Sequence, residues 1–111
     1  MAAAHFKLDN LVAIIDKNNL QISGPTESVM SLGDMGAKWK SFGWEVFTVD
    51  GHSIPDILRL FDSVKAVKGK PIAIIADTIK GCGIPFIENN LKYHTAPLNE
   101  DEMNEALECL K

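Results

Sequence analysis

The most informative stretch of the sequence is Leu11-Val-Ala-Ile-Ile-Asp-Lys-Asn-Asn-Leu-Gln-Ile-Ser-Gly24. It begins with an unbroken apolar run, residues 11–15, which is typical of a parallel strand covered on both faces. The run stops at Asp-Lys-Asn-Asn, residues 16–19, whose short polar side chains can turn the chain or bind a hard cation through oxygen. Ligands of open α/β sheets lie just beyond the carboxyl ends of strands, which is where Asn18 and Asn19 are expected.

Two later segments are also predicted to be strands. Residues 44–49 alternate in polarity and are rich in β-branched and aromatic side chains. Residues 71–76 form another apolar run, which Pro71 and Asp77 bound. Helical patterns separate the strands, and this alternation favours an α/β fold, a layered α/β/α domain with a small, mostly parallel sheet. So narrow a sheet is expected either to pair with something else or to be part of a larger one.

Caps and apolar periodicity predict the helices. Ser31 is expected to cap a helix that Gly43 ends, and Ser53 to cap one that Gly69 stops. Residues 1–7 are predicted to be the end of a helix, residues 81–98 mostly loop, and the acidic turn at 99–102 the start of the last helix. The apolar stripes expected to face the core are Leu32, Met35, Trp39 and Phe42 in the first capped helix, and Ile54, Ile57, Phe61 and Val64 in the second.

Composition limits the possible classes of protein. A chain of 111 residues with 46% hydrophobic and 23% charged residues is expected to form one folded domain at most, over residues 1–111. The net charge of −4 and the scattered lysines argue against nucleic-acid binding. No apolar run reaches the length of a membrane span and no signal peptide is visible, so a cytoplasmic protein is expected. Cys82 and Cys109 are interpreted as free thiols.

Several motifs together resemble the transketolase family and, more loosely, other thiamine-diphosphate enzymes. In the family's order, they are residues 5–27, Phe42-Gly-Trp-Glu-Val46, Val49-Asp-Gly-His52, Thr78-Ile-Lys-Gly-Cys-Gly83 and Tyr93-His-Thr-Ala-Pro-Leu98. The resemblance covers nearly the whole chain and implies the N-terminal, diphosphate-binding domain of the family. The Gly-Asp-Gly that opens the family's motif does not occur, and too few residues precede Asn18 to hold it. Residues 1–111 are therefore expected to be the C-terminal half of that domain, with a partial thiamine-diphosphate-binding fold.

The resemblance assigns a metal and cofactor role to the turn after the first strand. It implies that the Asn18 side chain and the Leu20 backbone carbonyl coordinate a Mg²⁺ or Ca²⁺ ion held by the diphosphate of thiamine diphosphate. The residues alone leave open that Asn18 merely ends a strand in a turn. Asn19 replaces a glycine frequent in transketolases, but asparagine tolerates the positive φ of a left-handed turn.

Two later residues complete the expected site. His94 matches a transketolase histidine beside the cofactor diphosphate and the sugar donor, where an imidazole can donate a hydrogen bond or shuttle protons, and we assign it a cofactor-binding and catalytic role. Lys80 would help to neutralise the diphosphate. The residues alone favour an exposed loop histidine for His94 and a turn for the Lys80-Gly-Cys-Gly83 pattern. Thr95 replaces a usual glycine, which makes the backbone there less free.

Other residues at recurring family positions receive structural interpretations. Gly24 and Asp50-Gly51 are expected to shape turns, and His52 is only a weak site candidate. Cys82 has no partner in the sequence that would lower the pKa of its thiol, so it is not proposed as a nucleophile.

The resemblance also implies an activity and partners. A transketolase transfers a two-carbon ketol unit from a ketose phosphate to an aldose phosphate, and the cofactor supplies the carbon chemistry. The pyrimidine-binding domain, from another part of the enzyme or another subunit, is not in this sequence, so the chain alone is expected to be inactive and to belong to a homo-oligomeric assembly. Two alternatives remain: a fragment of a deoxyxylulose-phosphate synthase or of a 2-oxo acid dehydrogenase component, and a non-catalytic, self-associating α/β module.

Overall fold

The computed structural model describes residues 1–111, which form two compact units. The first, called here the sheet unit, consists of Met1–Lys17 and Leu32–Thr78. The second, the loop unit, consists of Asn18–Ser31 and Ile79–Lys111. The expectation of one domain over residues 1–111 stays a prediction.

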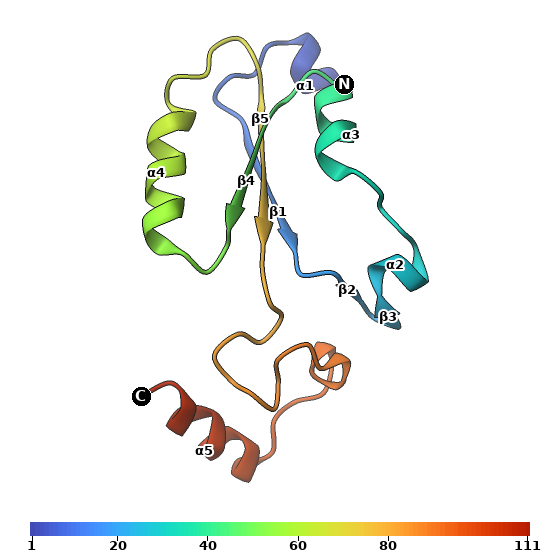
Figure 1. Ribbon diagram of the computed structural model, residues 1–111, viewed down its shortest axis with the longest axis vertical. Coiled ribbons are helices and arrows are strands. Elements are labelled where there is room, and N and C mark those ends of the chain that lie inside the picture. Colours follow the sequence, from blue (N-terminus) through green and yellow to red (C-terminus); the bar gives the residue numbers. More distant parts are fainter. The chain divides into compact units, whose positions relative to one another are not determined.

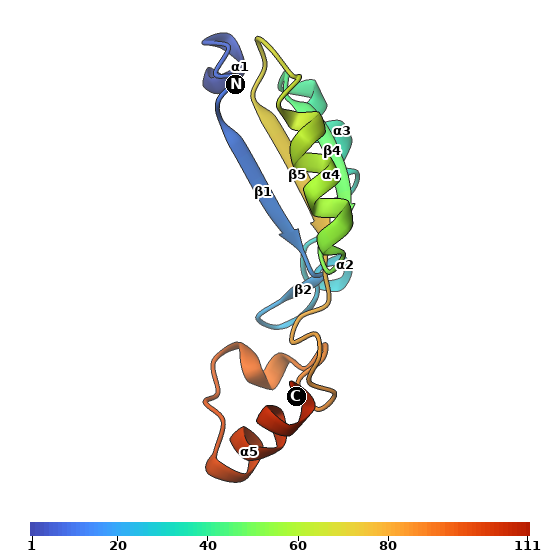
Figure 2. The ribbon, with the colours of Figure 1, turned by 90° about the vertical axis from the view of Figure 1, so that its left-hand side faces the viewer.

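The sheet unit is built on three parallel strands. These are β1 (Val12–Lys17), β4 (Glu45–Asp50) and β5 (Ile72–Asp77), in the order β1-β5-β4. Their three arrows point the same way in Figure 1, and Figure 2 shows β1 and β5 side by side. The register pairs Lys17 with Asp77 and Asp77 with Asp50. The carboxyl ends of all three strands therefore meet at one edge, and the predicted small parallel sheet is confirmed.

The central strand of this sheet is β5, whereas β1, which contains the apolar run after Leu11, is an edge strand. Every residue of Ile72 to Ala76 is buried, because β5 has a strand on each side and a helix over each face. β1 lies at the edge, where Ile14 is 61% exposed, so the prediction that residues 11–15 are covered on both faces is wrong. The strand also continues beyond the predicted stop, since Asp16 pairs with Ala76.

Helices cover both faces of the sheet, which confirms the layered α/β/α architecture (Figure 1). On one face, α4 (Ile54–Val64) places Val64 in a core with Ile72 and Ile74. On the other face lies α3 (Met35–Ser41), where a Cβ added at Gly36 would be 3.8 Å from the Ile75 side chain. Successive residues of β5 thus serve the two faces alternately, as the pleat requires.

The cap of α4 is confirmed and that of α3 is not. Ser53 Oγ accepts a hydrogen bond from the Asp56 N–H at 3.4 Å. In α3 the cap is Asp34, whose Oδ1 accepts from the Ala37 N–H at 2.8 Å, whereas Ser31 Oγ donates to Glu27 Oε2. Aspartate and serine are equally good N-caps, so the spacing alone could not choose between them.

The predicted apolar stripes are only partly right. In the α3 region Met35 and Trp39 are partly buried, but Leu32 precedes the helix and Phe42 follows it, and both are exposed. The helix predicted between Ser31 and Gly43 is therefore about one turn longer than the observed α3. In α4 the residues that face the sheet are Ile57, Leu60 and Val64, while Phe61 is 38% exposed and Ile54 63% exposed. The helix ends at Val64, not at Gly69.

The remaining elements are short. α1 (Ala2–His5) belongs to the sheet unit and confirms the predicted N-terminal helix. The loop unit holds β2 (Leu20–Gln21), β3 (Gly24–Pro25), α2 (Thr26–Val29), the 3₁₀ helix η1 (Leu91–His94) and α5 (Glu100–Cys109). Residues 81–98 are otherwise turns and loop, as predicted. None of the helices combines the length and the apolar character that crossing a bilayer requires.

Candidate functional site

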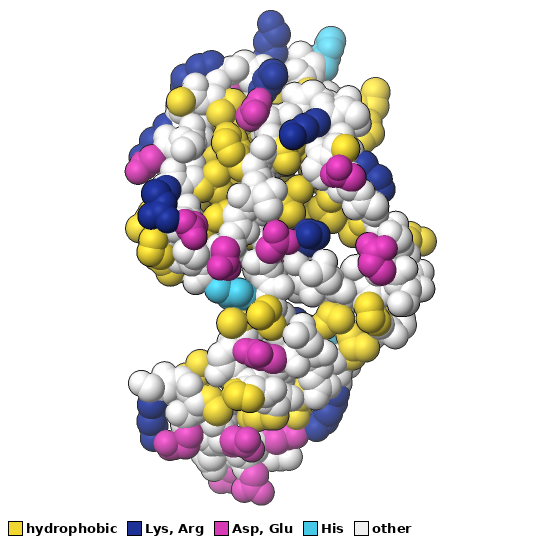
Figure 3. Space-filling view, in the orientation of Figure 1, with side chains coloured by type: hydrophobic (Ala, Val, Ile, Leu, Met, Phe, Trp, Pro, Cys, Tyr) yellow, Lys and Arg dark blue, Asp and Glu magenta, His cyan; other side chains and the backbone are white.

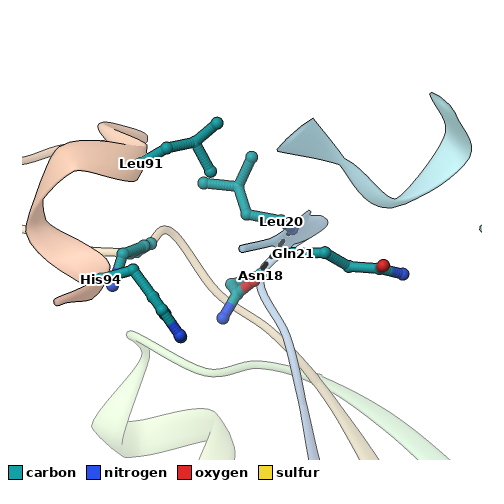
Figure 4. Close-up of a pocket in the computed structure, with 6 residues that line it drawn as sticks. Asn18, Leu20, Gln21, Leu91 and His94 are labelled. Carbon is teal, nitrogen blue, oxygen red and sulfur yellow. Dashed lines mark hydrogen bonds between the residues drawn. The ribbon is translucent and has the colours of Figure 1, made fainter. Parts of the chain in front are cut away.

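The loop unit contains a cavity of about 90 Å³ that brings together the site residues expected from the sequence. Its lining residues are Asn18, Leu20, Gln21, Lys80, Leu91 and His94. In Figure 4 the side chains of Leu20 and Leu91 point toward each other across it, and Gln21 points away from His94. Two segments far apart in the sequence thus supply one polar cavity with an apolar wall.

Asn18 forms a turn immediately after β1. Its Oδ1 accepts a hydrogen bond from the Leu20 N–H at 2.9 Å, which is an Asx turn. Asn19 then adopts a φ of 60°, the left-handed conformation expected of it, and its carbonyl accepts from the Thr26 N–H at 2.9 Å. The turn interpretation of Asn18 therefore holds, yet an amide oxygen has two lone pairs and this bond uses one.

The backbone carbonyl of Leu20 faces no donor across the small β2–β3 ladder. Leu20 and Pro25 form a non-hydrogen-bonded pair, because the Thr26 N–H bonds to the Asn19 carbonyl on the next rung, so the Leu20 carbonyl points away from β3. Gly24 lies in β3 rather than in the expected turn, but its role is structural, because it is buried next to Pro25 and a Cβ there would be 3.4 Å from the Val29 side chain. Asn18 Oδ1 and the Leu20 carbonyl are two hard oxygen donors on successive parts of one turn.

Lys80 precedes a turn in which glycine is required. Gly81 has a φ of +73°, and a Cβ there would lie 2.5 Å from Ile87 Cγ2 and 2.9 Å from the Ile87 carbonyl oxygen. The Lys80 carbonyl accepts from the Asn89 N–H at 2.9 Å, which closes the loop. The glycines therefore shape the loop, and the partly buried Lys80 side chain supplies the cavity's cation. Cys82 is an exposed free thiol.

His94 is the last residue of η1 and, like Lys80, lines the cavity from the segment after β5, whereas Asn18 lines it from the segment after β1. Asn90 begins η1 by accepting from the Lys92 N–H at 3.0 Å, and the Lys92 carbonyl accepts from the Ala96 N–H at 3.2 Å. Thr95 has a φ of −130°, which any residue adopts. Replacing the family's glycine by Thr95 therefore introduces no backbone strain.

Sequence reasoning missed Glu102, which ties η1 to the start of α5. Its Oε1 accepts from Lys92 Nζ at 2.8 Å and from the Tyr93 hydroxyl at 2.9 Å, and its Oε2 accepts from the Asn99 N–H at 3.0 Å. The Lys92 ammonium, then the Asn99 amide and Tyr93, lower the pKa of Glu102 to about 2, and Glu102 in turn raises the pKa of Lys92. The signal was the Asn-x-x-Glu spacing of a capping box, which is present.

The weak candidate His52 lies in the sheet unit and does not line this cavity. Its N–H donates to Asp50 Oδ1 at 2.9 Å, and the Gly51 N–H donates to the Asp77 carbonyl at 2.8 Å. A Cβ at Gly51 would be 2.4 Å from Thr78 Cγ2, so glycine is needed where these two strand ends approach. The interpretation of Asp50-Gly51 as a turn is confirmed.

The sheet unit and the cavity define the class of protein. A parallel sheet with helices on both faces makes this an α/β domain. The cavity of the loop unit offers a cation, an imidazole and two oxygen donors, a set of groups that suits an anionic ligand with its counter-ion. The chain has no group of three His, Cys, Asp or Glu side chains that could hold a metal ion.

Comparisons with known proteins identify the family. The family model of the transketolase, thiamine diphosphate binding domain matches residues 1–110. The chain is 45% identical over 107 residues to one subunit of the apulose-4-phosphate transketolase of Phocaeicola vulgatus, covering 96% of this chain and 38% of that protein. The corresponding protein of Actinobacillus succinogenes, which has the same name, is 40% identical over 111 residues, covering 100% of this chain and 40% of that protein.

Solved structures agree with this result. The transketolase of Campylobacter jejuni superposes with a TM-score of 0.88 at 32% identity, covering 96% of this chain and 17% of that one. The transketolase of Leishmania mexicana gives 0.87 at 26% identity, covering 99% and 17%. The chain therefore belongs to the transketolase family, within its thiamine diphosphate-binding domain. It spans about two fifths of the length of the two apulose-4-phosphate transketolase relatives.

Proposed function

We propose that this chain supplies part of the thiamine diphosphate site of a transketolase, which transfers a two-carbon ketol unit from a ketose phosphate to an aldose phosphate. The observation that carries the proposal is the single cavity lined by Asn18, Leu20, Lys80 and His94. Residues 1–111 would then be one part of a thiamine diphosphate-binding domain that further chain completes.

In this proposal Asn18 and Leu20 hold the divalent cation that binds the diphosphate. Oxygen donors of an amide and a backbone carbonyl suit Mg²⁺ or Ca²⁺. Asn18 Oδ1 keeps a lone pair beyond its bond to the Leu20 N–H, and the Leu20 carbonyl points away from the β2–β3 ladder. Both ligands are neutral, so phosphate oxygens and an additional anionic ligand must complete the coordination. Binding by the chain alone should therefore be weak.

Lys80 and His94 act on the phosphates and on the sugar in this proposal. The Lys80 ammonium offsets diphosphate charge in a partly buried position, where Coulomb attraction is less screened than at the surface. The His94 imidazole donates a hydrogen bond to a phosphate oxygen or carries a proton to and from the sugar donor. Thiamine diphosphate, when bound, supplies the chemistry that breaks and forms the carbon–carbon bond.

The proposal includes a protein partner. The names of the two apulose-4-phosphate transketolase relatives describe each of them as one subunit of its enzyme, so those enzymes contain more than one kind of chain. We infer that the pyrimidine-binding domain of the active enzyme comes from another subunit, that the assembly contains more than one copy of each, and that sugar phosphates reach the cavity only in that assembly. The isolated chain should show no ketol transfer.

Nuclear magnetic resonance (NMR) titration tests the site even if affinity is millimolar. Thiamine diphosphate with Mg²⁺ should shift the amide signals of Asn18, Leu20, Lys80 and His94, and omission of Mg²⁺ should reduce the shifts at Asn18 and Leu20 most. Asn18→Ala and His94→Ala should each abolish most of the response, whereas the matched controls Asn104→Ala and His5→Ala, both at exposed positions, should not. Shifts confined to other residues would refute the site. If calorimetry instead finds a micromolar affinity for thiamine diphosphate with Mg²⁺ that Asn18→Ala abolishes, the site stands and only the expectation of weak binding is wrong.

The alternative of a self-associating α/β module has one observation in its favour. β1 is an edge strand, and Ile14 on it is 61% exposed beside an apolar cavity under α4 that includes Phe61 and Ile74. Sedimentation velocity of the chain and of Ile14→Lys separates the two functions. A dimer that the substitution dissociates, combined with no NMR response to thiamine diphosphate, would favour the module.

A further inference from the structure

We propose that Glu102 is a positioning residue for His94: its carboxylate fastens η1 to the first turn of α5 and so fixes where the imidazole enters the cavity. The link to cofactor binding rests on the proposed function. The link between Glu102 and the conformation of His94 does not, and it can be tested without any ligand.

The carboxylate of Glu102 joins three donors from two segments. Lys92 Nζ and the Tyr93 hydroxyl reach Oε1, and the Asn99 N–H reaches Oε2, all within 3.0 Å. The Glu102 side chain is 20% exposed and that of Lys92 56%, so the bond to the Tyr93 hydroxyl is the more sheltered of the two on Oε1. Charge-assisted bonds of this kind are stronger than neutral ones.

The segment between Asn90 and Asn99 is fixed at both ends. Asn90 Oδ1 accepts from the Lys92 N–H at one end, and Asn99 Oδ1 accepts from the Glu102 N–H at 2.9 Å at the other. Glu102 connects the two, because its donors Lys92 and Tyr93 directly precede His94. The Tyr93 ring also packs edge-on against Phe86, with centroids 5.8 Å apart.

His94 depends on this fastening more than a buried side chain would. It is exposed, and no hydrogen bond within the chain involves its imidazole. The position of the imidazole is therefore set by the backbone of η1, and that backbone is held by its neighbours' bonds to Glu102. Precise placement of a group that binds phosphate needs such support from its surroundings.

The other acidic residues of α5 do not share this role. Acidic side chains gather over α5 (Figure 3), but Glu100, Asp101 and Glu105 are exposed, and Glu108 pairs only with Lys111. Glu105 lies less than one helical turn beyond Glu102 and carries the same charge. Glu105→Gln is therefore a matched control for the loss of one charge from α5.

Two ligand-free measurements test the positioning. The first is the imidazole carbon–proton NMR signal of His94, with those of His5 and His52 as internal references in the sheet unit. The second is hydrogen exchange at the Tyr93 and Ala96 amides, which close η1 onto Asn90 and Lys92. Glu102→Ala should move the His94 signal alone and speed exchange at both amides at least tenfold. Tyr93→Phe, which keeps the ring, should produce a smaller change of the same kind, and Glu105→Gln none.

A double-mutant cycle then tests the consequence for the ligand. Glu102→Ala and His94→Ala should weaken the response to thiamine diphosphate with Mg²⁺ to a similar extent, and the double variant should be no weaker than His94→Ala. Additive losses, or an unchanged His94 signal in folded Glu102→Ala and Tyr93→Phe, would overturn the proposal. If the unmodified chain shows no ligand response, the proposed function fails, and the ligand-free signals still decide whether Glu102 positions His94.

Discussion

The two units of this chain are stabilised by different interactions. The sheet unit has a continuous parallel ladder and an apolar core in which Ile72, Ala73 and Ile74 are at most 2% exposed. The loop unit has two-residue strands, and Ala106 is its only buried hydrophobic residue. It is stabilised by Asx turns, by the capping box of α5 and by the Glu102 cluster, that is, Glu102 with its donors Lys92, Tyr93 and Asn99. Apolar burial thus dominates one unit and directed polar bonds dominate the other.

This difference separates stability from the candidate site. Burial of apolar surface is non-directional and tolerates small shifts, whereas a hydrogen bond is lost when its partners move by less than an ångström. The residues proposed to bind cofactor all lie in the loop unit. Substitutions in the sheet unit should mainly change the free energy of unfolding, and those in the loop unit should mainly change the geometry of the cavity.

The largest effect should come from the centre of the sheet. Ile72→Ala removes a side chain that is 1% exposed and should lower the free energy of unfolding by about 2–5 kcal/mol, through lost burial and a new cavity. Ile14→Ala on β1, where the side chain is 61% exposed, should cost less than about 1 kcal/mol. Urea unfolding of both variants measures the difference. Equal losses would mean that β1 is covered in solution.

A smaller effect is expected at the turn after Lys80. Gly81→Ala places a Cβ against the Ile87 backbone at positive φ and should destabilise the loop unit by about 1–3 kcal/mol. Gly69→Ala is the matched control in the sheet unit, because φ there is +70° but nothing lies within 4 Å of the new Cβ. Exchange of the Asn89 amide, bonded to the Lys80 carbonyl, reports the loop directly. Faster exchange in the Gly69 variant than in the Gly81 variant would contradict this account.

Sequence patterns predicted the sheet unit better in outline than in detail. The three strands, α4 and its Ser53 cap follow from local chemistry, that is, apolar runs and a serine before a proline and an aspartate. Strand order does not follow, since residues 11–15 and 71–76 are both apolar runs and only tertiary packing puts β5 in the centre. Ser31 failed as a cap because Asp34 offers the same hydrogen bond three residues later.

In the loop unit the family resemblance gave the residues and the structure gave their arrangement. Asn18, Lys80 and His94 are too far apart in sequence for spacing to place them around one cavity. The bonds of Glu102 to Lys92 and Tyr93 could not be predicted either, because they depend on how the loop after η1 returns to α5. Only the capping half of the Glu102 cluster had a local signature.

The two helix caps give a finer comparison between the units. Asn99→Ala removes one bond of a capping box and should cost about 1 kcal/mol, together with a shift of the Tyr93 signal, because the box includes Glu102. Ser53→Ala removes a single, longer bond of 3.4 Å and should cost less, about 0.5 kcal/mol. Chemical unfolding and NMR of both variants measure this, and a larger loss in Ser53→Ala would reverse the ranking.

The smallest effect should be local and appear only in acid. The pKa of Glu102 is lowered from 4.5 to about 2, foremost by Lys92, so its carboxylate stabilises the folded state fully above about pH 4.5 and loses that contribution as pH falls through 2. The Asn99 amide signal, bonded to Glu102 Oε2, should therefore titrate with a midpoint near 2. Glu102→Gln should abolish that transition, and Glu105→Gln should leave it in place. A midpoint near 4.5 in the unmodified chain would mean that Lys92 and Tyr93 do not hold Glu102 in solution, and the positioning of His94 would lose its physical basis.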